Sequence, residues 1–279
     1  MLGAKKWVKI NKFPKSLDSI RGVFEIENTL YIDRKKGISS MKNNTYQFLS
    51  DEWIGMSSCE WGSWETSCLV GNCILKIYMK DYDRCESTLF NTNNKKFSEL
   101  KIVTNRKYFG VVHYLHKVWI VDGDDRNHKK LDTIQTFDLI KKTTSLPPIK
   151  MIKGRCAHKV IVYNGKLFVF GGVEKGERIL NSVEMYSPDI YKFVMMAPMK
   201  IARYDFACCR VRNLVYIIGG STGFGVNDPY HDQLKFNYKR TNLVEVYNLD
   251  TDTWTDGEKI PNKDSYILEA CAVSNVITE

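Results

Sequence analysis

Four arginines recur along the chain where a similar stretch of sequence begins again. They are Arg21, Arg106, Arg155 and Arg203. A guanidinium group is planar, always charged, and able to form two parallel hydrogen bonds with one carboxylate. If these side chains gather in space, their chemistry suits the binding of an acidic peptide. The alternative is structural: each arginine pairs locally and holds neighbouring repeats together.

Tyrosines lie near three of the predicted repeat starts. They are Tyr108, Tyr204 and Tyr266. Tyrosine combines a large rigid surface with a polar end, so it contributes strongly to protein contacts. Together with the arginines, these tyrosines form the predicted partner-binding set. The alternative for each tyrosine is packing between repeats.

The elements that must position these residues are short strands. The stretch from Arg203 to Gly220 crosses two apolar runs and stops at a glycine pair. The second run, Leu214 to Ile218, is apolar at every position, which predicts a strand covered on both faces. Arg155 to Gly172 and Arg106 to Gly123 repeat the pattern, with 17 residues from arginine to glycine and 13 from arginine to an aromatic residue.

Aromatic residues on a later strand keep a second spacing. Four of them are followed by another aromatic residue seven positions on: Tyr46/Trp53, Phe90/Phe97, Tyr186/Phe193 and Tyr247/Trp254. Phe137/Thr144 keeps the spacing without the second ring. The series Trp7, Trp53, Phe97, Thr144, Phe193, Trp254 has intervals of 46, 44, 47, 49 and 61. A period of roughly 40–50 residues built from short strands predicts an all-β propeller.

The repeats predict one domain over residues 1–279 with six blades. Five units are expected at 21–57, 65–103, 106–150, 155–199 and 203–261. The sixth blade is expected to be split between the termini and incomplete, from 264–279 and 4–13. The fifth unit has 27 residues from Gly220 to Tyr247, against 14 from Gly172 to Tyr186. The extra residues predict a long loop at 221–240 that contributes to specificity.

Glycine pair, Glu-x-Tyr, an aromatic residue seven positions on, and Pro-Met together resemble the Kelch repeat. The best matches are Gly171-Gly172, Glu184, Tyr186, Phe193 and Pro198-Met199, and then Gly219-Gly220, Glu245, Tyr247 and Trp254. The resemblance is strong over 106–275 and weak over 4–103. The sequence NSVEMYSP and the arginine that opens each unit look most like animal Kelch-like adaptor proteins.

In the Kelch-like family, BTB and BACK domains bind a cullin scaffold and the propeller captures the substrate for ubiquitination. The resemblance therefore implies a substrate-recognition propeller, with cullin contact only through a BTB region that this sequence lacks. It also implies a partner-binding face on which the arginines and tyrosines lie. An actin-binding or cytoskeletal Kelch scaffold is the first alternative. A propeller metalloenzyme, such as a copper oxidase or a hydrolase, is the second.

Charge and cysteine content restrict the partners and the compartment. The formal net charge is +9, but the basic residues are dispersed and no nucleic-acid module is recognised, so no nucleic acid is expected. No apolar stretch reaches 18 residues and no secretory signal is recognised, so neither a membrane span nor secretion is expected. The eight cysteines form no CxxC motif. Buried, reduced thiols in the cytoplasm are predicted.

The histidines do not favour catalysis. They are His113, His116, His128, His158 and His231. His113 and His116 lie three apart in a predicted strand, so they face opposite sides. No Ser/His/Asp arrangement is recognised, and the glycine pairs lack the residues of a phosphate loop. The prediction is therefore a binding protein with no catalytic residues, no metal and no cofactor.

Overall fold

The computed structural model describes residues 20–26, 29–36, 42–49, 52–60, 65–81, 84–94, 96–223, 225–226, 235–236 and 239–261. Their strands form five four-stranded antiparallel sheets, each built from strands that follow one another along the chain. The first sheet contains β1 (Ile20–Ile26), β2 (Thr29–Lys36), β3 (Lys42–Leu49) and β4 (Glu52–Glu60). The second contains β5 (Glu65–Val70), β6 (Cys73–Asp81), β7 (Arg84–Asn91) and β8 (Lys96–Glu99).

The remaining three sheets repeat the same order. The third contains β9 (Gly110–Tyr114), β10 (Lys117–Val121), β11 (Ile134–Asp138) and β12 (Thr143–Ser145). The fourth contains β14 (Lys159–Tyr163), β15 (Lys166–Phe170), β17 (Val183–Ser187) and β18 (Lys192–Met196). The fifth contains β19 (Ala207–Val211), β20 (Leu214–Ile218), β25 (Val244–Asn248) and β26 (Thr253–Asp256). Residues 4–13 and 264–279, predicted to form the closing blade, lie outside the described residues.

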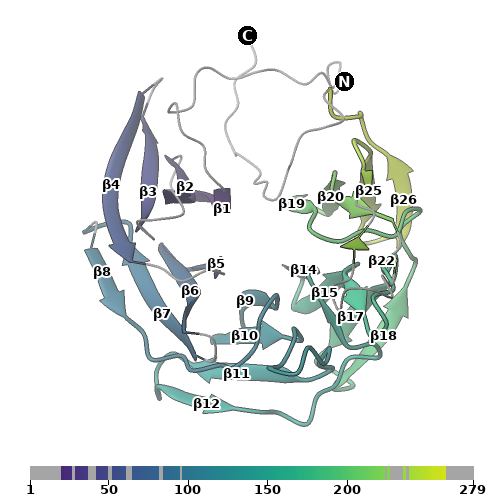
Figure 1. Cartoon of the computed structure of the whole chain (residues 1–279), viewed down its shortest axis with the longest axis horizontal. Coiled ribbons are helices and arrows are strands. Elements are labelled where there is room, and N and C mark those ends of the chain that lie inside the picture. The colour runs from purple at the N-terminus through teal and green to yellow at the C-terminus, as the bar shows by residue number, and fades with distance from the viewer. Residues whose placement is uncertain are drawn as a thin grey trace.

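The five sheets are arranged around a common centre (Figure 1). The first strand of each sheet, β1, β5, β9, β14 or β19, lies nearest the centre, and the last lies at the outer edge. Each sheet thus has two ends. We call the end with the hairpin turns β9–β10, β11–β12, β14–β15 and β17–β18 the hairpin face. We call the opposite end, with the connections 122–133, 171–182 and 219–243, the loop face.

The core lies between neighbouring sheets, because one four-stranded sheet cannot bury both of its faces alone. Leu167 and Val169 of the fourth sheet pack with Trp119 and Val121 of the third. Phe168 and Phe170, on the other face of β15, pack with the fifth sheet. The fourth sheet is therefore apolar on both faces, which explains the unbroken apolar run of β15 in the sequence.

In the second, fourth and fifth sheets the seven-residue aromatic spacing is a cross-strand pair. The prediction is wrong for Tyr46 and Trp53 of the first sheet, because an irregularity in the strand register places Tyr46 opposite Gly55. Tyr186 lies opposite Phe193 on β18, with ring centroids 5.4 Å apart. Tyr247 lies opposite Trp254 with centroids 4.7 Å apart. Side chains directly opposite in an antiparallel pair contact each other and stabilise the sheet. The spacing thus reports the β-hairpin of the two outer strands.

The glycine pairs allow a close approach between sheets. A side chain at Gly172 would begin 2.5 Å from the carbonyl oxygen of Cys156, and the φ angle of Gly172 is +97°. The N–H of Gly172 donates to the carbonyl of Arg203 at 3.0 Å, and that of Gly123 donates to Arg155 at 2.9 Å. Each repeat is thereby tied to the arginine of the next repeat.

Short two-stranded sheets add to the loop face. They pair β13 (Arg155–Cys156) with β16 (Val173–Glu174), β21 (Ser221–Thr222) with β24 (Lys239–Arg240), and β22 (Gly225–Val226) with β23 (Lys235–Phe236). The last two pairs belong to the extra residues of the fifth unit. Residues 224, 227–234 and 237–238 of the predicted specificity loop lie outside the described residues. Within the described ranges, no helix is long and apolar enough to cross a membrane.

Candidate functional site

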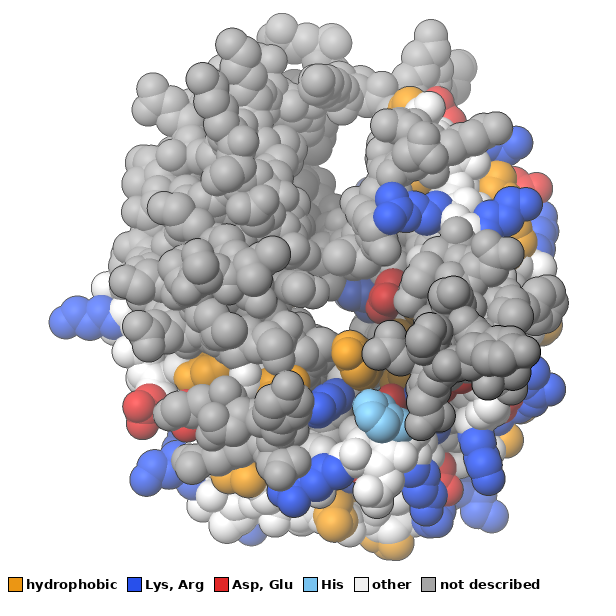
Figure 2. Space-filling view, in the orientation of Figure 1, with side chains coloured by type: hydrophobic (Ala, Val, Ile, Leu, Met, Phe, Trp, Pro, Cys, Tyr) orange, Lys and Arg blue, Asp and Glu red, His pale blue; other side chains and the backbone are white. Residues whose placement is uncertain are grey.

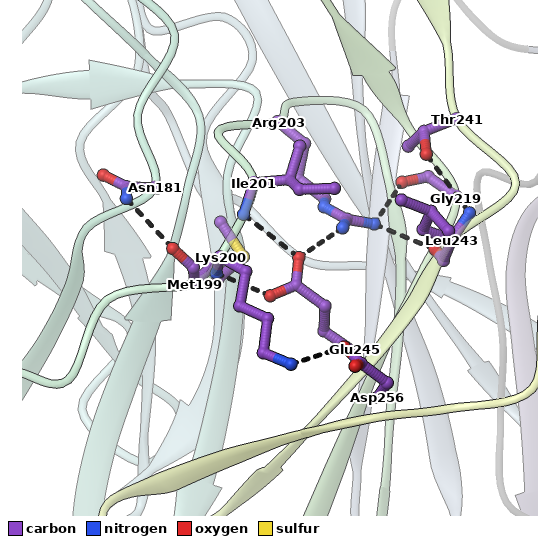
Figure 3. Close-up of polar contacts among 10 residues, drawn as sticks. All are labelled: Asn181, Met199, Lys200, Ile201, Arg203, Gly219, Thr241, Leu243, Glu245 and Asp256. Carbon is purple, nitrogen blue, oxygen red and sulfur yellow. Dashed lines mark hydrogen bonds and ion pairs between the residues drawn. The ribbon is translucent and has the colours of Figure 1, made fainter.

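Arg203 is the centre of a buried polar cluster at the inner end of the fifth sheet (Figure 3). Its guanidinium donates to the carbonyls of Gly219 at 2.9 Å and Leu243 at 3.0 Å, and it pairs with the carboxylate of Glu245. Burial lowers the pKa of Arg203, while Glu245 opposes that shift. The side chains of both residues are at most 2% exposed, so the pair is sealed from solvent.

Glu245 also holds the segment that precedes Arg203. Its carboxylate accepts hydrogen bonds from the backbone N–H of Lys200 at 2.6 Å and of Ile201 at 3.3 Å. Figure 3 shows these bonds beside the ion pair between Lys200 and Asp256. One carboxylate therefore compensates a buried cation and two backbone donors at once, which a buried charge requires.

Arg155 repeats this arrangement in the fourth sheet. It donates to the carbonyls of Gly171 at 3.0 Å and Ser182 at 3.3 Å, and pairs with Glu184. Glu184 in turn accepts from the N–H groups of Ile152 and Lys153, at 2.8 and 3.1 Å. Both charged side chains are completely buried.

Arg106 has a different environment in the third sheet. It donates to the carbonyl and hydroxyl oxygens of Thr133, at 2.5 and 3.0 Å, and to the carbonyl of Asp122 at 3.3 Å. The position of the glutamate is taken by Gln135, which donates to the carbonyl of Val103 at 2.7 Å. Arg106 is 4% exposed.

These positions correct one part of the sequence-based expectation. Arg106, Arg155 and Arg203 do not lie open at a channel mouth, because backbone carbonyls and glutamates occupy their guanidiniums inside the protein. These three arginines pair locally, as the alternative stated, but the partners of their guanidiniums lie in the same repeat as the arginine and not in a neighbouring one. Their burial also removes the reason for preferring an acidic partner. Arg21 lies in β1, and Tyr266 lies outside the described residues.

Two residues after each of these arginines, the backbone adopts a left-handed conformation. Tyr108, Ala157 and Asp205 have φ angles of +55°, +53° and +48°. The N–H of Ala157 donates to the carbonyl of Tyr108 at 2.8 Å, and that of Asp205 donates to Ala157 at 3.2 Å. These three residues link the inner ends of three sheets. Non-glycine residues rarely adopt such angles, and where they do, the strain often marks a functional position.

Tyr108, Asp205 and the neighbouring Tyr204 differ in how far their side chains are exposed to solvent. Tyr108 is 45% exposed and Asp205 is exposed, whereas Tyr204 is 8% exposed and packs with Cys156 and Val173. Burial and then Asp124 raise the pKa of Tyr108. Tyr108 therefore keeps the role of a predicted contact residue on geometric grounds. Tyr204 packs between repeats, which is the alternative given for it.

An ion-pair network lies next to Tyr108 on the loop face. The Nζ of Lys130 is 2.9 Å from Asp124 and 3.3 Å from Glu177, so it joins the connection 122–133 to the connection 171–182. Its side chain is only 7% exposed. The sequence did not point to Lys130 or Asp205, because the residue types at their positions differ between repeats. The position two residues after the repeat arginine, which Tyr108 also occupies, is the signal that could have identified Asp205.

Two buried polar side chains distinguish the boundary between the third and fourth sheets. A side chain at Gly171 would begin 2.9 Å from the ring of Phe206. One repeat earlier, Asp122 occupies the glycine position and His158 occupies the phenylalanine position. A side chain at Gly110, which pairs with Val121, would begin 2.8 Å from Nε2 of His158. His158 and Asp122 thus hold the positions that Phe206 and Gly171 hold one repeat later, and both side chains are at most 4% exposed.

His, Cys, Asp and Glu side chains among the described residues are groups that could hold a metal or act as nucleophiles. No group of three or more His, Cys, Asp or Glu side chains in the described ranges has the arrangement of a metal site. Burial lowers the pKa of His158 well below its ordinary value. Burial also raises the pKa of Cys68 to about 12 and of Cys85 to about 11, so these thiols are poor nucleophiles. His231 lies outside the described residues.

A sequence profile of the Kelch motif matches residues 154–200 and 202–259. Kelch-like protein 28 of Homo sapiens is 33% identical over 143 residues, which are 49% of this chain and 22% of that protein. An F-box/kelch-repeat protein of Arabidopsis thaliana is 28% identical over 180 residues, which are 61% of this chain and 40% of that protein. The matched part is less than half the length of each relative.

The fold has a solved counterpart. The structure of YjhT superposes with a TM-score of 0.70 and 11% sequence identity, covering 91% of this chain and 87% of that one. At this identity the likeness concerns the fold alone. With the Kelch motif matches, it makes the chain an all-β Kelch-repeat propeller. Over part of its length the chain is distantly similar to the propeller regions of Kelch-like proteins.

Proposed function

We propose that this propeller is a protein-interaction module that captures substrates for a cullin-RING ubiquitin ligase. The observation that carries the proposal is the row Tyr108, Ala157 and Asp205 at the inner end of the Kelch sheets. It presents an exposed aromatic ring and a carboxylate from a backbone that hydrogen bonds hold in place. Such preorganised contacts lower the entropic cost of binding.

The proposal has three further parts. The ring closes with six blades, the module works without catalysis, and it acts in the cytoplasm. Buried thiols such as Cys68 and Cys85 suit a reducing compartment. Similarity to a Kelch-like protein and to an F-box/kelch-repeat protein supports the link to ubiquitin ligases, because the Kelch-like family resemblance implies substrate capture and the second name joins Kelch repeats to an F-box. Cullin contact would come from a BTB region outside the described propeller.

Photocrosslinking from two tyrosine positions tests the contact face. A photoreactive phenylalanine analogue replaces Tyr108 on the loop face in one variant and Tyr191 on the hairpin face in another. Both tyrosines are exposed and have left-handed φ angles of +55° and +54°, so the variants are matched. We expect one discrete protein adduct from position 108 and none of equal yield from position 191.

The captured protein then tests the ligase role. Its ubiquitin conjugates should increase in cells that express the wild-type chain fused to a BTB domain. They should not increase with Tyr108→Ala and Asp205→Ala combined. An adduct without any change in ubiquitination would leave a binding module and contradict the ligase role. Cosedimentation with filamentous actin would instead favour the cytoskeletal alternative, and stoichiometric bound copper would favour the metalloenzyme.

A further inference from the structure

Large apolar side chains stand exposed on the turns of the hairpin face. Leu115 in the β9–β10 turn is 54% exposed and Ile140 in the β11–β12 turn is 86% exposed. In the β17–β18 turn, Ile190 is 54% and Tyr191 is 73% exposed. Isolated exposed apolar residues are ordinary, but several on one face mark an interaction surface.

These turns share one end of the molecule. In the third sheet the β9–β10 and β11–β12 turns lie at the same end, because the four strands alternate in direction. The hydroxyl of Tyr114 donates to the carbonyl of Gly165 at 2.6 Å, which joins this end to the β14–β15 turn of the fourth sheet. The β17–β18 turn lies at that same end of the fourth sheet.

The turns themselves do not require apolar residues. The β14–β15 turn has Asn164 and Gly165, the residues that such two-residue hairpins prefer. The matching β9–β10 turn has Leu115 and His116, with φ angles of +49° and +59°. An aliphatic residue is unfavourable in this conformation, so Leu115 costs stability in its backbone as well as in its exposure.

The β17–β18 turn likewise has an apolar residue where another sheet has a polar one. Tyr191 has a φ angle of +54°, and the residue at its position in the fifth sheet is Asp252, with a φ angle of +53°. The tip position of Ile140 is occupied in the fifth sheet by Asp250 and in the second by Asn93. Polar residues therefore fit these turns, and among the described turns of the second to fifth sheets the apolar tips lie in the third and fourth.

Lysines accompany the apolar tips. Lys117, Lys141, Lys142 and Lys192 lie within two residues of them in the sequence. Asp138 is the acid beside Lys117 and Lys141. Its pKa is lowered, first by the hydrogen bond from the N–H of Lys141 and then by other groups, which include the charges of both lysines. Figure 2, which shows one face of the molecule, has Lys and Arg side chains both at the outer edge and nearer the centre of the described part.

We propose that the hairpin face docks the propeller on an anionic lipid bilayer. Leu115, Ile140 and Tyr191 would enter the boundary between headgroups and acyl chains, where apolar and amphipathic side chains are favoured. The lysines would approach the negative headgroups. This departs from the sequence-based expectation of no membrane contact. It leaves the loop face, at the opposite end of the sheets, open to a protein partner.

A lipid surface fits these features better than an acidic protein does. The anchors stand on the tips of three separate turns, and a fluid surface accommodates separate points without a matching shape. A rigid partner requires a continuous complementary patch of standard interface size. The combination of exposed aliphatic tips with neighbouring lysines is also the composition of surface-bound membrane anchors.

Vesicle sedimentation of the full chain tests the proposal. Vesicles of phosphatidylcholine with about 30% phosphatidylserine, in about 0.1 M salt, should bind the protein at least about tenfold better than pure phosphatidylcholine. Leu115→Asn, Ile140→Asn and Tyr191→Asn combined should lower binding at least about tenfold. Asparagine tolerates left-handed φ angles, so this variant should fold at least as well as the wild type.

A matched control removes an equally exposed aliphatic side chain from the other end of β12. Leu146 is 68% exposed there, and Leu146→Asn should bind vesicles like the wild type. Failure of the wild type to bind the anionic vesicles would overturn the proposal. So would a triple asparagine variant that binds as well as wild type. Equal binding of wild type and triple variant to soluble polyglutamate, without vesicle binding, would point to an acidic protein instead.

Discussion

In the third and fourth sheets, the segment around the repeat arginine is held by different buried side chains. In the fourth, Arg155 pairs with Glu184, and Gly171 leaves space for Phe206 of the next sheet. In the third, Gln135 replaces the glutamate, Asp122 replaces the glycine, and His158 occupies the phenylalanine position. The backbone contacts are nevertheless equivalent, since Gly123 and Gly172 each donate to the following arginine.

The backbone hydrogen bonds are therefore the same in both sheets, whereas the buried polar side chains differ. Arg106 keeps two carbonyl acceptors although it lacks a glutamate, so the arginine position survives the substitution. What is lost is the carboxylate that accepts from two N–H groups of the preceding segment. The arginine of the fourth sheet is held by one buried ion pair, whereas Arg106 of the third sheet donates to neutral carbonyl and hydroxyl oxygens.

Removal of the glutamate should have the largest effect. Glu184→Ala should destabilise the protein by about 3–5 kcal/mol, because it leaves Arg155 buried without an anion and two N–H groups without an acceptor. Gln135→Ala, the matched change in the third sheet, should cost about 1 kcal/mol. Urea unfolding measures both. Equal losses of unfolding free energy would show that the buried glutamate of the fourth sheet contributes no more than the glutamine of the third.

Conversion of the third boundary into the next one should stabilise the protein. Asp122→Gly with His158→Phe should raise the unfolding free energy by about 2 kcal/mol, because two buried polar side chains that lack hydrogen-bond partners are replaced by an apolar contact. His158→Phe alone should destabilise, since a Cβ at Gly171, the position matching Asp122, would begin 2.9 Å from the ring of Phe206 and leaves no room for a carboxylate beside a phenylalanine. A double-mutant cycle measures this coupling, and additive effects would show that the two positions do not interact.

The pH dependence of stability should reveal the same pair. Burial, then Arg155 and Lys159, lower the pKa of His158, so its contribution is complete above about pH 6.5 and is lost as the pH falls. Burial raises the pKa of Asp122, so its contribution is present below about pH 3.8 and is lost as the pH rises. The two effects oppose each other in the wild type.

Asp122→Asn therefore isolates the histidine. Its unfolding free energy should fall by about 1 kcal/mol between pH 6.5 and 5.5, more steeply than that of the wild type. Asparagine keeps the size of the side chain and tolerates the φ angle of +53°. Urea midpoints at both pH values measure the change. Parallel pH profiles for variant and wild type would argue against a buried titrating His158.

The hairpin turns should give the smallest effect. Leu115→Asn with His116→Gly gives the β9–β10 turn the residues of the β14–β15 turn, and should stabilise by about 0.5–1 kcal/mol. Thermal unfolding measures the gain. The reverse change, Asn164→Leu with Gly165→His, should cost a similar amount. No difference in either direction would mean that these turns are indifferent to their residues.

Much of the fold was predictable because propeller repeats are local. The aromatic spacing of seven corresponds to cross-strand pairs such as Tyr186 and Phe193, and the strand at Leu214 to Ile218 is β20 with the predicted limits. The Kelch resemblance was confirmed by the motif match. The site was harder to predict, since a residue type shows its chemistry but not its exposure. Arg155 and Arg203 have suitable chemistry for an acidic partner, yet they are buried.

The sequence by itself determined the period, the strands and the Kelch class, because these depend on residues within one repeat. Only the tertiary structure decided which arginine faces a glutamate, which tyrosine stays exposed, and that His158 and Asp122 are both buried. Those outcomes depend on contacts between repeats. The burial of a charge and its compensation are set by neighbours that lie distant in the sequence, so no local pattern encodes them.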